Sequence, residues 1–193
     1  YVTTRNNTEV YTAHRTLLQS RGSDGGLFIP FRIPVFTQRE ILDLGKKSFN
    51  ANLADALNLL FGTHLVSYDL DLALGRHSVR LQKLGQRIVM AECWHNTDWT
   101  FARMMADISA LLVKSGDTPF APHGWAGTGI RIAVLFGIFG ELIRENIVST
   151  DRKIDVSVVS GDFDAPMAAW YARAMGLPIG NIICCCNENA ALW

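Results

Sequence analysis

Between residues 154 and 186 the chain carries two short apolar runs separated by a glycine turn and a helical pattern, and this order leaves few folds open. β-Branched residues fill Ile154–Val159, which is typical of a buried strand. Gly161 follows closely, and Ala165–Met175 has apolar residues at helical spacing up to Gly176. Ile182–Cys186 is the second run. The stretch therefore predicts a right-handed βαβ unit, whose first turn and helix N-terminus form the kind of place where α/β proteins bind anions.

Helical patterns dominate the rest of the chain. Thr37 and Glu40 have the spacing of a capping box, which predicts a helix over Gln38–Leu44. Residues 130–146 are almost wholly apolar, so a helix there must be covered on most sides. The sequence RIVMA at 87–91 predicts a strand. Further helices are expected at residues 9–18, 52–60, 67–74 and 101–113.

Together these elements predict an α/β fold with three layers, in which a mainly parallel sheet has helices on both faces. The sheet is expected to contain Arg87–Ala91, Ile154–Val159 and Ile182–Cys186. The long apolar helix should be buried against it. We expect residues 1–84 to form an N-terminal helical cap and residues 85–193 to form the α/β core.

Composition excludes several classes of function. The charges sum to zero and 49% of the residues are apolar, so the chain is not expected to bind nucleic acid or a membrane surface. The longest apolar run, Ile132–Phe139, is too short to span a bilayer, and no secretory signal precedes Tyr1. The four cysteines, Cys93 and Cys184–Cys186, lack C-x-x-C spacing, and three of them alternate faces along a strand. We therefore expect no metal site and a reduced, cytoplasmic chain.

Five short segments at the two ends of the chain share the motifs of one enzyme family. They are YVTTR at 1–5, SDGGLFIP at 23–30, SGDFD at 160–164, AMGLPI at 174–179 and CNEN at 186–189. In the same order they resemble the motifs Y-x-S-T-R-G, A-P-D-G-G-L-Y-V-P, SGNFG, K-x-M-G-L-P-I and ATNEND of threonine synthase. The resemblance implies the large domain of the tryptophan synthase β-like fold and an enzyme that uses pyridoxal phosphate (PLP) to convert phosphohomoserine to threonine.

The family's lysine motif, E-x-F-H-G-P-T-x-A-F-K-D, is only partly present. The chain has Glu92, His95 and Phe101 in register with it, but Ala102 stands where the lysine forms the Schiff base with PLP. Arg103 cannot replace that lysine, because a guanidinium stays protonated and forms no stable Schiff base. Lys114, in the same predicted helix, is about 18 Å away at helical rise. We therefore expect no catalytic residue of the PLP type.

The phosphate loop also departs from the family. The resemblance assigns cofactor binding to a vestigial region at Gly161, Asp162, Phe163, Asp164 and Asn187, in which two carboxylates replace Asn and Gly. Two carboxylates would repel a phosphate dianion. The simpler interpretation is that Asp162 or Asp164 caps the following helix, and a cation site that uses both is the alternative.

A third departure lies between the two central helices. The family has most of a smaller domain there, including the motif T-S-G-D-T-G, whereas this chain has only the loop 115–129. Ser115–Thr118 resembles that motif, and Gly127–Gly129 is a second match. Either match could arise by chance, because short glycine motifs are common.

Three functions are compatible with these observations. The first is a threonine synthase-like protein that has lost PLP catalysis and acts in binding, regulation or interaction, with no cofactor and no metal. The second is an active PLP-dependent threonine synthase-like lyase, if the motif register is wrong or if the chain is incomplete and missing sequence supplies the lysine. The third is a hydrolase that uses His95, Glu92 and Asp162, for which no nucleophile is evident. Under the first, we expect a homo-oligomer or a protein partner to cover the aromatic set Trp94, Trp99, Phe120 and Trp125, or an unknown small molecule to bind.

Overall fold

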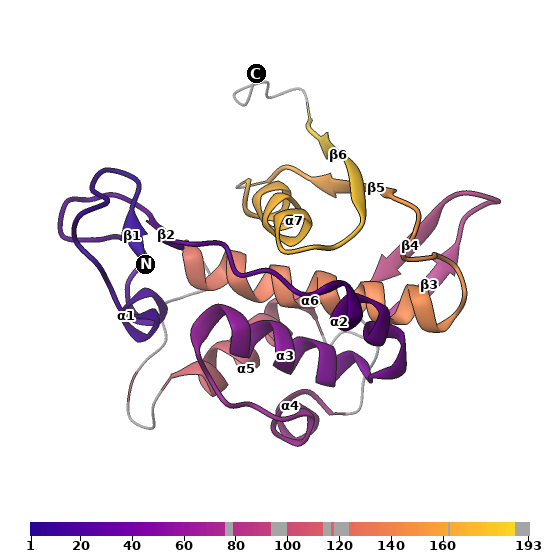
Figure 1. Ribbon diagram of the computed structural model, residues 1–193, viewed down its shortest axis with the longest axis horizontal. Helices are drawn as coiled ribbons and strands as arrows, with labels where there is room; N and C mark the ends of the chain where they lie inside the picture. The colour runs from indigo at the N-terminus through magenta and orange to yellow at the C-terminus, as the bar shows by residue number, and fades with distance from the viewer. Residues whose placement is uncertain (76–78, 94–99, 114–116, 118–123, 162, 188–193) are drawn as a thin grey trace.

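A long helix, α6 (Trp125–Arg144), runs through the middle of the molecule in the computed structural model (Figure 1). The structure describes residues 1–193 except 76–78, 94–99, 114–116, 118–123, 162 and 188–193. One side of α6 carries α3 (Phe49–Phe61), α4 (Ser67–Leu74) and α5 (Phe101–Leu112). The other side carries α7 (Asp164–Ala174) with the strands β5 (Ile154–Val159) and β6 (Ile179–Cys185).

The contact between α3 and α6 is the tightest in the core, because α6 presents glycines where α3 presents large side chains. A Cβ at Gly137 would lie 2.5 Å from side-chain atoms of Phe49 and Leu53. A Cβ at Gly140 would overlap Asn52 Nδ2 and lie 3.0 Å from the carbonyl oxygen of Leu44. The absent side chains thus let the two helix backbones approach closely, as small residues do wherever helices pack at short distance.

Burial follows the apolar pattern of α6. By length and composition α6 is the one helix among the described residues that could cross a membrane, but 78% of its most apolar stretch is buried inside the protein. Ile130, Ile132 and Phe136 have no exposed surface. The prediction that this helix is buried is confirmed, but α6 packs mainly against α3 and α7 and not against the sheet, and it begins at Trp125, five residues earlier than expected. Because α6 is apolar on nearly all sides, its surface must be covered on more than one side, and neighbouring elements on both sides cover it.

The N-terminal part consists of short elements that extend along α6 from one of its ends to the other (Figure 1). The capping box at Thr37 is confirmed: its hydroxyl accepts the Glu40 N–H, and Glu40 Oε2 accepts the Thr37 N–H at 2.7 Å. The helix near the N-terminus begins at Ala13, later than the predicted start at residue 9. The elements are β1 (Val2–Thr3), α1 (Ala13–Leu18), β2 (Phe28–Ile29), α2 (Gln38–Asp43) and the 3₁₀ helix η1 (Leu44–Lys46), with β1 and β2 antiparallel.

The βαβ unit is confirmed. β5 and β6 pair in parallel, with Val158 opposite Cys184 and a register irregularity between Ile154 and Val156. Ile154, Val156 and Ile182 pack against the core on one face of this sheet. The side chains on its other face are exposed.

The predicted three-stranded parallel sheet is wrong for its first member. β4 (Val89–Glu92) pairs antiparallel with β3 (Arg80–Lys83), a strand that sequence reasoning missed, and the two form a hairpin that projects from one end of the molecule (Figure 1). The described residues thus form three two-stranded sheets instead of one three-layer parallel core. β4 pairs with its neighbour β3 and not with the distant strands, because closing a short turn costs less chain entropy than bringing distant strands together.

The α3–α6 contact can be tested with a matched pair of glycine substitutions. Gly140→Ala should lower the free energy of unfolding by about 2 kcal/mol, because the methyl group displaces the buried Asn52 amide from Leu44 and this outweighs the gain in helix propensity. Gly85→Ala is the control, since nothing lies within 4 Å of a Cβ there. Urea denaturation of both variants measures the difference, and equal stabilities would contradict the packing argument.

Candidate functional site

The structure brings the expected lysine position and the expected phosphate loop toward the same residue, Arg131 of α6. The Arg131 guanidinium carbon lies 5.8 Å from the centre of the Phe101 ring, in the first turn of α5. Arg131 Nη1 lies 3.5 Å from Asp164 Oδ2, in the first turn of α7. Thr128 Oγ1 lies 3.5 Å from the other oxygen of Asp164. The N-terminal turns of α5 and α7 are therefore linked through one face of α6.

Ala102 is exposed beside this cluster. It lies in the first turn of α5, which begins after Thr100, whose hydroxyl accepts the Arg103 N–H at 3.2 Å. Arg103 Nε in turn donates to both carboxylate oxygens of Asp107, at 3.2 and 2.9 Å. The position that the motif register assigns to the lysine thus presents a methyl group, and the neighbouring Arg103 is paired within its own helix.

The turn before α7 differs from the expected cap. The N-cap is Phe163, in the left-handed region with φ 69°, and its side chain makes no capping hydrogen bond. Asp164 is the first helical residue, so the prediction that it is the N-cap is wrong; Asp162 lies outside the described residues. The reason is local: Gly161 and Phe163 both have positive φ, and with Phe163 as the cap the helix starts at Asp164, one residue earlier than an Asp164 cap would need.

The anion-binding capacity of this turn is limited by its backbone. The Phe163 N–H donates to the carbonyl oxygen of Ser160 at 2.5 Å, so it is engaged within the turn. Pro166, in the first turn of α7, has no N–H to offer. Gly161 is exposed, and so is Asn187, which follows β6. Two of the backbone donors that a phosphate would use at a helix N-terminus are thus taken or missing.

Sequence reasoning missed Arg131, and its presence changes the electrostatics of the site. The side chains of Arg131 and Asp164 are 20% and 19% exposed, so they form a largely buried ion pair. The sequence held one signal for it, a single arginine within the apolar run of α6. Because this guanidinium offsets the charge of Asp164, the repulsion of an anion by Asp164 is weaker than the sequence alone predicts.

Several other candidates are placed elsewhere. Glu92 lies on the β3–β4 hairpin, where its carboxylate is 3.8 Å from Arg80 Nε, and His95 lies outside the described residues. Asp117 pairs with His14 Nε2 at 3.1 Å, but the rest of Ser115–Thr118 is not described. Gly127–Gly129 is buried within α6, so it cannot form a phosphate loop.

The expected exposed aromatic set is wrong for Trp125. Its ring is buried, 5.5 Å from the ring of Tyr1 and 5.1 Å from that of Tyr171. The other members, Trp94, Trp99 and Phe120, lie outside the described residues. Trp125 therefore joins the N-terminal segment to α7 instead of marking a surface.

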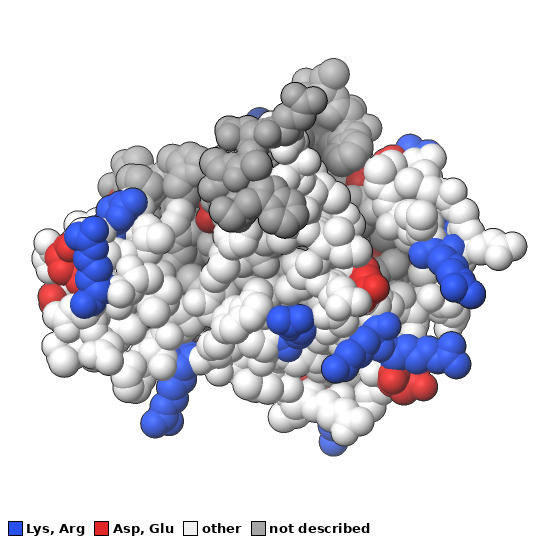
Figure 2. Space-filling model, turned by 90° about the horizontal axis from the view of Figure 1, so that it is seen from above, with Lys and Arg blue, Asp and Glu red and all other residues white. Residues whose placement is uncertain are grey.

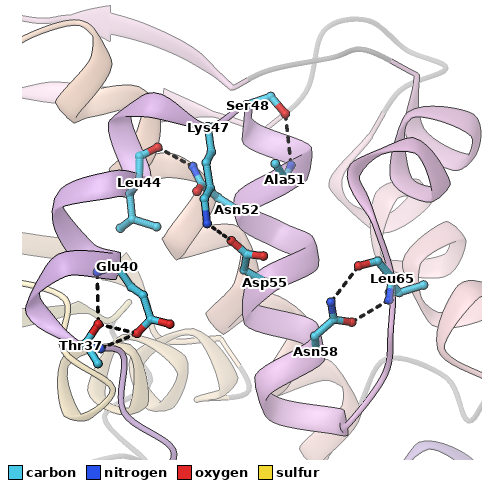
Figure 3. Close-up of polar contacts among 10 residues, drawn as sticks. All are labelled: Thr37, Glu40, Leu44, Lys47, Ser48, Ala51, Asn52, Asp55, Asn58 and Leu65. Atoms are coloured by element: carbon cyan, nitrogen blue, oxygen red, sulfur yellow. Dashed lines mark hydrogen bonds and ion pairs between the residues drawn. The ribbon is translucent and has the colours of Figure 1, made fainter.

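Two grooves on the described surface are lined by residues that do not include Arg131. The smaller, of about 250 Å³, is lined by Phe36, Gln38, Ile41, Thr150, Gly176 and Pro178. The larger, of about 350 Å³, lies between α2 and α3, and its polar side chains are engaged with one another (Figure 3). Lys47 Nζ is 2.6 Å from Asp55 Oδ2, and Asn58 bonds the backbone of Leu65 through both ends of its amide. These contacts hold the helices together and leave little polar capacity for a ligand.

The cysteines differ in reactivity. Burial raises the pKa of the half-buried Cys93 thiol to about 11, whereas Cys184, Cys185 and Cys186 are exposed. Among the described residues no three His, Cys, Asp or Glu side chains are placed to hold a metal ion.

A thiol titration should separate these two classes. On the order of one Cys93 thiol in ten thousand is ionised at pH 7, and the thiolate is the reactive form, so Cys93 should react far more slowly than the others. With a disulfide reagent we expect three thiols to react quickly in the native protein and the fourth only after unfolding in denaturant. Rapid reaction of all four thiols in the native protein would contradict the burial of Cys93.

The Arg131–Asp164 pair can be measured by a double-mutant cycle. We expect a coupling free energy of about 1 kcal/mol between Arg131→Met and Asp164→Asn, because the pair is largely withdrawn from water. The control is the exposed pair of Arg103 and Asp107, for which about 0.4 kcal/mol is expected. A coupling no larger than that of the control would show that Arg131 does not hold α7 through Asp164.

Comparison with known proteins gives the family context of this geometry. Residues 1–75 match the family described as threonine synthase N terminus. Threonine synthase-like 1 of Mus musculus is 35% identical over 68 residues, which are 35% of this chain and 9% of that protein. The Homo sapiens protein of the same name is 36% identical over 52 residues, which are 27% of this chain and 7% of that one. The matched segments thus span less than a tenth of these relatives.

The fold has a solved counterpart. The crystal structure of threonine synthase from Escherichia coli superposes with a TM-score of 0.73 at 16% identity, over 97% of this chain and 64% of that one. The similarity at such low identity concerns the fold, and it confirms an α/β architecture. The N-terminal match independently confirms the resemblance seen in the motifs at residues 1–5 and 23–30. The chain is thus similar to threonine synthase-like proteins in its N-terminal residues and to threonine synthase in its fold.

Proposed function

We propose that this chain is a threonine synthase-like protein without PLP catalysis, which acts through binding, as a regulatory or interaction protein. The observation that carries the proposal is the exposed methyl group of Ala102 at the position where the family's motif has its lysine. PLP enzymes need a primary amine there, because the Schiff base both holds the cofactor and is exchanged for the substrate amine. No lysine occurs in α5.

The remaining residues of the site do not fit the cofactor either. A phosphate at the start of α7 would meet the Asp164 carboxylate, the missing N–H of Pro166 and the engaged N–H of Phe163. Arg131, the cation that contacts this turn, is paired with Asp164. A carboxylate in the first turn already interacts favourably with the helix dipole, which a bound anion would otherwise do. The lost amine and the altered turn therefore support the same proposal.

The alternative enzyme classes gain little support from the geometry. For a hydrolase, Glu92 is turned toward Arg80 on the hairpin, and the raised pKa of Cys93 makes its thiol a poor nucleophile at neutral pH.

We also propose a cytoplasmic location and a homo-oligomer or protein partner. Four free cysteines, three of them exposed, suit a reducing compartment.

The proposal is tested with PLP and borohydride. After incubation with PLP and reduction, mass spectrometry should find no specific PLP–lysine conjugate in the wild-type chain, and no phosphate should be released from phosphohomoserine above a no-protein control. Ala102→Lys should gain at most a conjugate without activity, since the turn at Phe163–Pro166 is unchanged. A threonine synthase that is active under the same conditions is the positive control. PLP-dependent phosphate release by the wild-type chain would refute the proposal.

A further inference from the structure

One peptide bond of this chain is of a kind that rearranges spontaneously in proteins. Asp24–Gly25 is the one Asp–Gly bond in the sequence, and no Asn–Gly bond occurs. At such a bond the backbone nitrogen of the glycine can attack the side-chain carboxyl carbon of the aspartate, because glycine has no Cβ to hinder the approach. The turn that contains the bond, residues 22–26, lies between α1 and β2.

Both oxygens of the Asp24 carboxylate are held by the fold. The Thr3 hydroxyl donates to Oδ2, and the Gly26 N–H donates to Oδ1 at 2.8 Å. These two hydrogen bonds, that of Thr3 above all, lower the pKa of Asp24. Loss of water from the attacked carbon requires the protonated carboxyl group, so the lowered pKa reduces the reactive fraction at neutral pH. Thr3 itself is buried, because β1 packs directly on the turn: a Cβ at Gly26 would lie 2.8 Å from the Thr3 Cβ.

The attacking nitrogen is engaged as well. The Gly25 N–H donates to the Gly22 carbonyl oxygen at 3.0 Å, and the Gly22 N–H donates to the Gly26 carbonyl oxygen at 2.9 Å. An amide nitrogen must lose its proton and turn toward the carboxyl carbon before it can attack. Both hydrogen bonds oppose this, because they hold the peptide unit within a closed turn.

Two arginine side chains hold the same turn from outside. Arg5 Nη1 donates to the carbonyl oxygen of Asp24 at 3.0 Å. Arg21 Nη1 donates to the carbonyl oxygen of Gly25 at 2.8 Å. Basic and acidic side chains occur together at this end of the molecule, which carries β1 and β2 (Figure 1, Figure 2). The backbone on both sides of the reactive bond is therefore fixed by contacts other than those of the carboxylate.

We infer that Asp24–Gly25 is a modification site that the fold keeps closed, and that isoaspartate forms there in proportion to the time for which the contact between β1 and the turn is open. In the reaction the Gly25 nitrogen bonds to the Asp24 side-chain carbon, and the amide proton leaves with the carboxyl OH as water. Another water molecule hydrolyses the resulting succinimide at either carbonyl, which returns aspartate or gives isoaspartate without a net change in mass. Isoaspartate lengthens the main chain by one carbon atom and takes the carboxylate away from Thr3 and Gly26, so the native turn is lost.

This inference is independent of whether PLP catalysis is lost, and substitutions at two adjacent threonines test it. Thr3→Val removes the hydroxyl and keeps the shape of the side chain, so isoaspartate should accumulate about tenfold faster than in the wild-type chain at neutral pH. Thr3→Ser keeps the hydroxyl and should stay close to the wild-type rate. Thr4→Val is the matched control, because the Thr4 hydroxyl accepts the Leu27 N–H and is not bonded to Asp24, and it should also keep the wild-type rate.

The product is measured on one proteolytic peptide. Trypsin releases residues 22–32, in which chromatography and fragmentation distinguish aspartate from isoaspartate. The same peptide free in solution should react at least about tenfold faster than the folded wild-type chain, and this comparison decides even where a variant fails to fold. Circular dichroism checks that each chain is folded. Equal rates in the free peptide and the folded wild-type chain would overturn the inference, and so would a folded Thr3→Val chain that reacts no faster than Thr4→Val.

Discussion

The close fit of α3 into the glycine-lined side of α6 is the contact on which the rest of the structure depends. It is possible only because Gly137 and Gly140 leave room for Leu53 and Asn52. Since the opposite side of α6 carries α7 and through it the β5–β6 sheet, any shift of α6 relative to α3 would be passed on to the βαβ unit. Close-packed interiors transmit such shifts instead of absorbing them, so the position of the candidate site is set by helix packing some distance from it.

Arg131 shows how the same helix fixes the charges of the site. It is the one charged residue in the apolar middle of α6, and its guanidinium reaches Phe101 on one neighbour and Asp164 on the other. A buried cation must be paired, and here the partner comes from the protein. The turn that resembles a phosphate loop is therefore neutralised internally, in a place where a cofactor-binding protein would keep its positive groups for the ligand.

Sequence patterns predicted the parts of the fold that depend on local periodicity. The capping box at Thr37, the helices α3 and α6 and the βαβ unit all follow from residues close in sequence. The partner of β4 was not predicted, because Arg80–Lys83 has no apolar run and because strand pairing depends on register as well as on composition. The burial of Trp125 was missed because an aromatic residue in a Gly/Pro-rich stretch gives no helical signal. At the site, the assignment of Ala102 to the lysine position stays a prediction from the motif, and the Arg131–Asp164 pair joins residues that only the packing of α6 on α7 brings together.

The distribution of the core explains how such a site can change without loss of the fold. Most of the largest fully buried side chains in the described part of the chain, including Phe136, Leu53 and Met104, lie on α3, α5 and α6, whereas the two strands of the βαβ unit are covered on one face only. Stability therefore resides mainly in the helical layers, and residues such as Ala102 and Gly161 at the surface of the site contribute little to it. Under the proposed function, substitution of the lysine and of the loop would remove chemistry at small cost in stability.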